Sequence, residues 1–561
     1  MKKLATMNRQ QASFVAYVET TLHWTFQHMA ALACAVINIW MCSAGSPAAE
    51  SPKSNTNEPA KEAPSGFDNL TNGFEEQEAF DRDREAFEEV ETILPEKAAS
   101  DHTGARAVTA KRRRFSLSGS NAANAAKEGS SGGLGPVYNA TSCVSCHQNP
   151  VSGSSSQVSE VRAGHNEKRK FVEHPGGSLL HQRAIDATIQ EHALAEDRIR
   201  TLRMSSTTLG SGFIEVIPDE EIRRIQKNQL KGLQGTIAIV PVAVKGKKTG
   251  EDQFQFEFVE RAGRFGWKCQ EASLINFSAG AYLNEMGITS PLNPDENTSD
   301  GRDVSQFDKV KDPEDEVDAS DSDNKEHPFG DDVKAFARFM RSSQVPPRDA
   351  SLVGDELVQK GARIFRDLDP DIPNRKKLGC AVCHLPDYIT PKAGTQIRPF
   401  NHDAKPGSDL PQVPEALGNK RIHPFSDFML HDIGTGDGIV QTQHAQKPPR
   451  GMSRANLLQS DLFGSGLSPE HVAPAPRIAT AEGVKLDDGQ ATAKMIRTAP
   501  LWGLRVRPQM LHDGRALTVE EAIRAHKVRG CDKKTKVDLP GNYDKLPPDK
   551  KNALKAFLNS L

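Results

Sequence analysis

The spacing of hydrophobic residues predicts helices in several parts of the chain. Within 331–340, hydrophobic residues recur at the three- and four-residue spacing of a helix with one buried face. The last residues, 548–561, show the same pattern. An acidic stretch over 74–93 carries scattered Phe and Leu and predicts one more helix. We therefore expect a mainly α-helical protein with long loops.

Strand patterns are confined to one region of the sequence. Residues 235–244 and 254–259 are rich in β-branched and aromatic residues and are bounded by Gly and Lys. Two such runs so close together predict a small β-hairpin inserted in the helical fold.

The N-terminal part of the chain has the order of an export signal. Lys2, Lys3 and Arg9 precede an apolar run from Met29 to Met41, and small residues follow it. The run is shorter than the roughly 20 residues of a spanning helix, which favours a cleaved signal over an anchor. We assign 1–45 to a signal peptide or N-terminal anchor, so the protein would contact a membrane only if this segment stayed uncleaved.

Two polar stretches divide the rest of the chain. Residues 46–130 are rich in Pro, Ser, Asn and Glu, then in Gly and Ala, and predict a disordered linker. Residues 291–327 are dominated by Asp, Glu, Ser and Asn and predict an acidic disordered insert. Two globular domains remain, at 131–290 and 328–561.

Composition argues against a nucleic-acid-binding protein. The formal net charge is −3, and five Tyr and four Trp leave few aromatic residues for stacking on bases. We expect no nucleic acid among the partners.

The sequence Cys-x-x-Cys-His occurs twice, at 143–147 and 380–384. On one helical turn the two Cys and the His share a face, so the thiols can bond to one haem while the His binds its iron. Random placement of eight Cys and seventeen His predicts roughly 0.003 such pentapeptides. The alternatives are a redox dithiol or half of a zinc site, but the following His and the lack of a neighbouring Cys-x-x-Cys weigh against zinc. We predict two covalently bound haem c groups, with these residues as their attachment points and iron ligands: Cys143, Cys146, His147, Cys380, Cys383 and His384.

Covalent haem also supports export, because in bacteria its attachment takes place outside the cytoplasmic membrane. We expect a periplasmic or otherwise exported protein. Cys269 and Cys531 would remain as further thiols after removal of a signal, either joined in a disulfide or unpaired and buried.

Several segments around the two motifs resemble one family, the di-haem oxidoreductases related to bacterial di-haem cytochrome c peroxidases. The resemblance covers about residues 130–561 without the acidic insert. The segments that carry it are Gly-Leu-Gly-Pro-Val-Tyr-Asn-Ala at 133–140, His-Pro-Phe-Ser-Asp-Phe-Met-Leu-His-Asp-Ile-Gly-Thr-Gly-Asp-Gly at 423–438, Arg-Thr-Ala-Pro-Leu-Trp-Gly-Leu at 497–504, His-Asp-Gly-Arg-Ala at 512–516 and Val-Glu-Glu-Ala-Ile at 519–523.

The resemblance implies two cytochrome c-like helical domains that face one another. The first haem would be the peroxidatic site, and the second would accept electrons from a donor and pass them on. In this family a Glu in a Glu-Met-Gly motif serves as acid/base, and a Trp in an aromatic and Gly-rich segment lies between the haems. Glu285 and Trp267 match these positions here. Their alternatives are a carboxylate on a helix surface and an ordinary core Trp.

The resemblance also suggests further ligands. The sixth ligand of the second haem is a Met in these peroxidases, but counting from His512 places His526 at that position. A second His lowers haem potential where Met raises it, so we expect a bis-His second haem of comparatively low potential. The alternative is a His at a helix end that is favoured by the helix dipole.

At the first haem, the distal side is less defined. Three histidines follow His147, and His165 is the nearest in spacing to the removable distal His of the family; His174 and His181 are the others, and an open site is equally consistent. His431 and His512 recur in the family motifs as hydrogen-bonding residues near haem. In these peroxidases a bound calcium ion helps to couple the haems, and the resemblance leaves open whether this chain binds calcium.

Together these features predict an exported peroxidase that reduces hydrogen peroxide with electrons relayed from the second haem to the first. A small cytochrome c or copper protein would be the electron donor. Two alternatives stand beside this function: a di-haem electron-transfer cytochrome without a substrate, and a di-haem oxidase of another small substrate.

Overall fold

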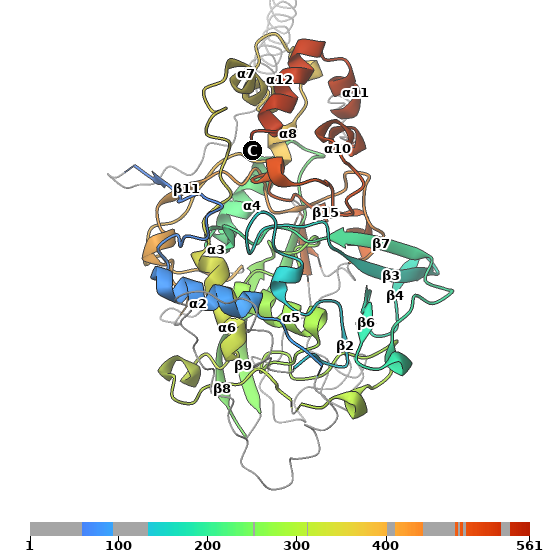
Figure 1. Ribbon diagram of the computed structural model, residues 1–561. Helices are drawn as coiled ribbons and strands as arrows, with labels where there is room; N and C mark the ends of the chain where they lie inside the picture. The colour runs from blue at the N-terminus through green and yellow to red at the C-terminus, as the bar shows by residue number, and fades with distance from the viewer. Residues whose placement is uncertain are drawn as a thin grey trace, which may run out of the picture. The chain divides into compact units, whose positions relative to one another are not determined.

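The computed structural model describes residues 59–93, 133–250, 253–310, 312–400, 410–440, 477–480, 483–485, 490–528 and 539–561 (Figure 1). The predicted export segment 1–45 and Cys531 lie outside these residues. Within the described part of the chain, no helix combines the length and the apolar composition needed to cross a membrane.

The regular elements are as follows. The α-helices are α2 (Gln77–Glu88), α3 (Ser211–Glu215), α4 (Asp219–Asn228), α5 (Leu274–Met286), α6 (Asp331–Ser342), α7 (Glu356–Phe365), α8 (Cys380–Cys383), α10 (Val519–Ala525), α11 (Leu539–Asp544) and α12 (Pro548–Leu558). The strands are β1 (Lys61–Glu62), β2 (Val137–Tyr138), β3 (Ser159–Glu167), β4 (Lys170–Glu173), β5 (Leu179–Leu180), β6 (Arg183–Ala184), β7 (Ile199–Met204), β8 (Ile237–Lys248), β9 (Phe254–Ala262), β10 (Tyr388–Ile389), β11 (Lys420–Ile422), β12 (Leu430–His431), β13 (Arg477–Thr480), β14 (Gly483–Lys485) and β15 (Ile496–Arg497). Among the short 3-10 turns are η3 (Cys143–Ser145) and η4 (Ala187–Ile189).

The prediction of a mainly α-helical fold with two cytochrome c-like helical domains is wrong. Helix accounts for 29% and strand for 19% of the described structure. The strands form two four-stranded sheets, β14-β13-β8-β9 and one in which β3 pairs with β4, β5 and β7, besides smaller pairings. The second sheet was missed because β3 reads Ser-Glu-Val-Arg-Ala-Gly-His-Asn-Glu, which has no regular alternation of apolar and polar residues.

The predicted hairpin is confirmed. β8 and β9 pair in antiparallel register from Ile239 opposite Ala262 to Lys248 opposite Phe254. Inward-facing residues of β8, such as Ala238 and Val240, pack on a buried cluster that includes Leu430. The hairpin is not an isolated insertion, because β13 pairs with the other edge of β8.

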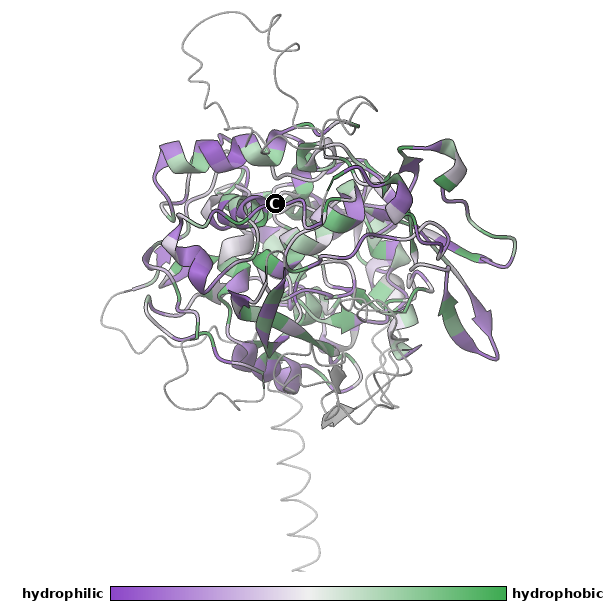
Figure 2. Ribbon diagram, turned by 90° about the horizontal axis from the view of Figure 1, so that it is seen from below, coloured by the Kyte–Doolittle hydropathy of each residue, from purple (hydrophilic) through white to green (hydrophobic). Residues whose placement is uncertain are grey.

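The three predicted helices are confirmed as α2, α6 and α12. In α6, Val333, Phe336 and Phe339 are buried, while two Asp in its first turn and Arg341 in its last turn suit the helix dipole. Hydrophilic and hydrophobic residues alternate along the helices in Figure 2, as expected for helices with one face against the core.

Part of the predicted linker is folded. α2 packs on α6, where the ring of Phe80 stacks on Phe339 with 5.3 Å between centroids. Asp83 of α2 accepts a hydrogen bond of 2.7 Å from Arg338 of α6, and β1 pairs in parallel with β11. The acidic composition led the sequence analysis to assign this helix to a linker, although Phe80 and Phe87 are buried together with Asp83.

The predicted acidic insert is also packed against the fold. Asp315 accepts hydrogen bonds from the backbone N–H groups of Asp332 and Val333, at 3.0 and 3.1 Å, and so caps the start of α6. The hydroxyl of Thr289 donates to Asp312 over 2.8 Å. The acidic side chains of this stretch accept hydrogen bonds from backbone N–H and hydroxyl groups. Composition alone cannot distinguish such a folded acidic segment from a disordered one.

A second core surrounds the second motif. α7 and α12 approach so closely that a Cβ on Gly361 of α7 would lie 2.0 Å from the carbonyl oxygen of Ala553 on α12. Phe365, Phe425 and Phe557 are buried in the same cluster. In Figure 1, α8 lies beside this helical group.

Candidate haem sites

The second Cys-x-x-Cys-His motif forms one helical turn. Gly379 precedes α8 with a φ of 73°, a left-handed conformation that glycine adopts without strain. Asp367 accepts hydrogen bonds from the backbone N–H groups of Leu378 and Gly379, at 2.8 and 2.9 Å. The N–H of His384 then donates to the carbonyl of Cys380 over 2.9 Å. This turn brings both thiols and the His to one side, as the motif requires.

A large cavity lies beside this turn. It contains about 1560 Å³ of empty space, part of it open to solvent, and it is lined by Cys380, Cys383, His384 and His526. The second motif and His526 therefore face one common cavity.

His384 and His526 are placed to hold a metal between them. Their ring centroids lie 6.3 Å apart. Two metal–nitrogen bonds of about 2.0–2.1 Å would take up roughly 4 Å of this separation, and the remainder is close to the two centroid-to-nitrogen distances. The Nδ1 atoms bond to the carbonyls of Phe425 (2.9 Å) and Ala522 (2.7 Å), which leaves both Nε2 atoms for a metal. Burial lowers the pKa of both rings, to about 4 for His384, so both are in the neutral form that binds metals. The donor set fits a bis-His haem.

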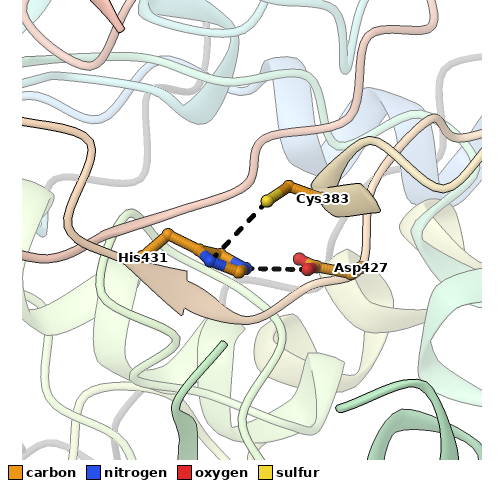
Figure 3. Close-up of side chains that lie close together, drawn as sticks. All are labelled: Cys383, Asp427 and His431. Carbon is orange, nitrogen blue, oxygen red and sulfur yellow. Dashed lines mark hydrogen bonds and ion pairs between the residues drawn. The ribbon is translucent and has the colours of Figure 1, made fainter. Parts of the chain in front are cut away.

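His431 lies next to the same motif (Figure 3). Its Nδ1 atom is 3.7 Å from Sγ of Cys383, and its Nε2 atom is 2.7 Å from Oδ2 of Asp427. A Cys–His–Asp order also occurs in nucleophilic catalysis. We do not assign that role here, because Cys380 and His384 of the same turn line the cavity with Cys383. His431 is positioned by Asp427 beside the haem site.

The first motif begins with the short helical turn η3. The side chain of Ser142 accepts a hydrogen bond from the N–H of Ser145, and the N–H of His147 donates to the carbonyl of Cys143 over 3.1 Å. The ring of Phe87 from α2 lies 6.3 Å from the ring of His147. Burial lowers the pKa of His147, so its ring is neutral. The segment 59–93 thus contributes to the surroundings of this site.

Glu285 lies at the end of α5, in a group of polar side chains beside the first motif. Asn139 donates a hydrogen bond to its carboxyl group over 3.2 Å. Burial, followed by the neighbouring charge of Glu160, raises the pKa of Glu285 to about 8. Glu160 itself is paired with Arg162 at 2.8 Å. Glu285 and Glu160 are also close enough to Cys146 to add to the rise in its pKa that burial causes. Glu285 is therefore protonated at neutral pH and lies near the attachment Cys.

Trp267 lines the large cavity together with Met204 and His512. Its indole Nε1 donates to the carbonyl of Met204 over 2.8 Å, and its ring meets the ring of His512 edge-on with 6.2 Å between centroids. His512 is 1% exposed, and burial lowers its pKa to about 4. Trp267 thus lies at the cavity of the second motif, held there by Met204 and His512.

A buried ion cluster fixes the surroundings of Trp267. Asp437 binds Arg203 at 2.9 Å and Lys268 at 2.8 Å, and these residues are the sequence neighbours of Met204 and Trp267. Lys268 also donates to the carbonyls of Thr492 and Met495. Burial lowers the pKa of Lys268 to about 8 although Asp437 acts in the opposite direction. Sequence reasoning missed Asp437 because nothing near it in the chain signals a distant Arg–Lys partner.

The three candidate distal histidines do not meet His147 in the structure. His174 lies between Asp197 and Asp300, and Nδ1 of His181 binds Glu191. His165 lies on β3, with its Nδ1 atom 3.7 Å from Asp197. None of the described hydrogen bonds, ion pairs or ring contacts joins these three residues to His147.

Comparison with known proteins identifies the family. Residues 178–446 match the family model described as "Di-haem oxidoreductase, putative peroxidase". This match, over a little under half of the chain, confirms the resemblance seen in the sequence and supports haem cofactors. The match includes Trp267, Glu285 and the second motif, and it ends before His526.

The other comparisons add no argument on function. Hydrazine synthase of Kuenenia stuttgartiensis matches with a TM-score of 0.28 and 15% identity, over 75% of this chain and 81% of that protein. At this TM-score the likeness carries no conclusion about fold or activity. No curated protein sequence matches the chain.

Proposed function

We propose that this protein is an exported di-haem peroxidase that reduces hydrogen peroxide to water with electrons from a small redox protein. The observation that supports it most strongly is the protonated Glu285 beside the first Cys-x-x-Cys-His motif. Reduction of one H₂O₂ to two H₂O requires two electrons and two protons, so a proton donor at the reacting site is needed.

The proposed haem contacts follow from the two motifs. Cys143 and Cys146 would hold one haem with His147 as its ligand, and Cys380 and Cys383 would hold the other between His384 and His526. The haems would supply electron storage and, at His147, an iron position for the substrate.

Glu285 is the proposed acid/base. With its pKa raised to about 8, the carboxyl group holds a proton at neutral pH that it can donate to the departing oxygen of peroxide. The substrate's own proton can then replace it. Asn139 fixes the orientation of the carboxyl group, and Glu160, held by Arg162, keeps the proton on Glu285 because two adjacent carboxylates resist double ionisation.

Trp267 is the proposed element between the two sites. The indole is held at its Nε1 atom by Met204, and the cavity that it lines also contains His384. The Asp437 cluster anchors Arg203 and Lys268 on both sides of this contact and so positions the ring.

The alternative of an electron-transfer cytochrome without substrate would require a second ligand at the first haem. Two of the three candidate histidines, His174 and His181, are already held by carboxylates. This arrangement favours an accessible first site, which a peroxidase and a di-haem oxidase of another substrate share.

The test is steady-state turnover of hydrogen peroxide by the purified holoprotein, with a reduced small cytochrome c as donor. Glu285→Gln is expected to lower the turnover rate by about 10²–10⁴-fold, the usual contribution of a positioned acid/base. The control is Glu271→Gln, since burial likewise raises the pKa of Glu271 to about 8, and Glu271 contacts neither motif within the described residues. Peroxide turnover that is equal in both variants would refute the role of Glu285.

A further inference from the structure

A buried cluster of histidine and carboxylate side chains lies apart from the residues proposed for haem. His174 directly follows β4, Glu191 follows η4, and Asp197 precedes β7. Asp300 comes from the acidic stretch 291–327. His174 is 1% exposed, Glu191 7% and Asp197 0%. The cluster thus joins the acidic stretch to the β3 sheet.

His174 has a carboxylate at each ring nitrogen. Nδ1 lies 2.6 Å from Oδ2 of Asp197, and Nε2 lies 3.0 Å from Oδ1 of Asp300. A neutral imidazole carries one N–H, so it can donate to only one of these carboxylates. The second contact would then place a nitrogen lone pair against a carboxylate oxygen. A cation is therefore required between His174 and one of its neighbours, either a second proton or a metal ion.

The position of Glu191 helps to distinguish a second proton from a metal ion at His174. Ligand atoms of His174, Glu191 and Asp300 all lie within 4.8 Å of one another. A proton on Nε2 is satisfied by Asp300 alone, and the side chain of Glu191 then serves His181, whose Nδ1 and backbone N–H lie 2.9 and 2.6 Å from its Oε2. A metal ion uses all three groups, and Asp197 then holds the far side of the imidazole, as a carboxylate does behind many zinc-bound histidines. The backbone N–H of Asp300 donates to Oε1 of Glu191 over 3.1 Å and fixes their spacing.

The charges of the cluster point the same way. Three carboxylates converge here, and Arg302 contacts Asp300 at a long 3.4 Å. Oδ1 of the fully buried Asp197 has no hydrogen-bond partner among the described residues, and Nδ1 of His165 lies 3.7 Å from it, beyond hydrogen-bond range. Buried carboxylates without a compensating positive charge are costly, and a cation held by Glu191 and Asp300 relieves this cost.

We propose that His174, Glu191 and Asp300 bind a zinc ion, with Asp197 as the residue that positions His174. The set of one imidazole nitrogen and two carboxylate oxygens is suited to zinc, and a water would complete four-fold coordination. The site fastens the acidic stretch to the first domain and is separate from both Cys-x-x-Cys-His motifs. It adds a metal to the protein without entering the proposed peroxide chemistry.

The test is elemental analysis of the purified holoprotein after incubation with zinc and removal of the excess. Haem iron provides an internal reference, so the expected result is one zinc for every two irons. Protein that retains no zinc after this treatment would overturn the proposal and assign the cation at His174 to a second proton.

Variants locate the ion. Asp300→Asn is expected to abolish retained zinc, and Asp197→Asn to weaken zinc binding by about 10–100-fold, the usual effect of losing such a supporting carboxylate. Glu196→Gln is the matched control, because it removes one negative charge from an exposed side chain adjacent to Asp197. Far-ultraviolet circular dichroism and haem absorption establish that each variant is folded. Zinc retained equally in folded Asp300→Asn and in the control would place the ion elsewhere and refute this site.

Discussion

Replacement of Glu285 by Gln should have opposite effects on two properties: the free energy of unfolding should rise, and the rate of peroxide turnover should fall. The raised pKa means that the folded protein keeps a proton on Glu285 that the unfolded chain releases. Between pH 4.5 and about 8 the folded state therefore binds one more proton than the unfolded state, and the stability contributed by this position falls as pH rises. Gln resembles the protonated carboxyl group and carries no such dependence.

The size of the effect follows from the shift. The pKa of Glu285 is about 8 in the fold and 4.5 in the unfolded chain. At pH 7 this difference lowers the free energy of unfolding by about 3 kcal/mol, compared with a side chain that is neutral in both states. At pH 4.5 the reduction is only a few tenths of a kcal/mol. Glu285→Gln should therefore raise the free energy of unfolding by about 3 kcal/mol at pH 7 and change it little at pH 4.5.

The assay is denaturant unfolding of the wild type and the variant at both pH values, followed by circular dichroism. Glu271→Gln should show a similar gain at pH 7, since burial raises the pKa of Glu271 to about 8 as well. Only Glu285→Gln should lose peroxide turnover. A Glu285→Gln variant that is no more stable than the wild type at pH 7 would mean that the carboxyl group is charged in the fold, which refutes its role as proton donor.

Three further variants test the remaining assignments. His526→Met should raise the midpoint potential of the second haem in a redox titration, because Met favours the reduced iron; an unchanged potential would exclude His526 as a ligand. Trp267→Phe should slow peroxide turnover without changing haem content by the pyridine haemochrome assay, and unaltered turnover would exclude the indole as the relay. Asp437→Asn should lower the free energy of unfolding by about 3–5 kcal/mol, because Arg203 and Lys268 would remain buried without their carboxylate. Denaturant unfolding measures this loss, and a change below 1 kcal/mol would show that the cluster is not stabilising.

The sequence predicted the helices and strands that have a regular pattern of hydrophobic residues. It missed the strands that lack such a pattern and are defined by long-range backbone pairing. α6 and α12 repeat hydrophobic residues at helical spacing, and β8 and β9 are rich in β-branched and aromatic residues, so each was found. β3 and β7 have no such pattern, and their pairing is a long-range event that single-strand composition does not reveal. This is why the fold was expected to be mainly α-helical.

The candidate site divides in a similar way. Local motifs predicted Cys380, Cys383 and His384, and counting within a resemblance placed His526, which lines the same cavity. Glu160 and Asp437 were not predicted, because their importance comes from partners far away in the chain, Glu285 and Lys268. The three histidines after His147 were predicted by spacing alone, and two of them are engaged by carboxylates that spacing cannot anticipate.

The most direct test of the central claim is stopped-flow absorption of the half-reduced holoprotein mixed with hydrogen peroxide. A peroxidase of the proposed kind should lose the reduced spectrum of the second haem at a rate that rises with peroxide concentration, and a reduced small cytochrome should restore it through repeated turnover. Haem spectra that do not respond to peroxide in either the oxidised or the half-reduced protein would contradict the proposed function and leave an electron-transfer cytochrome.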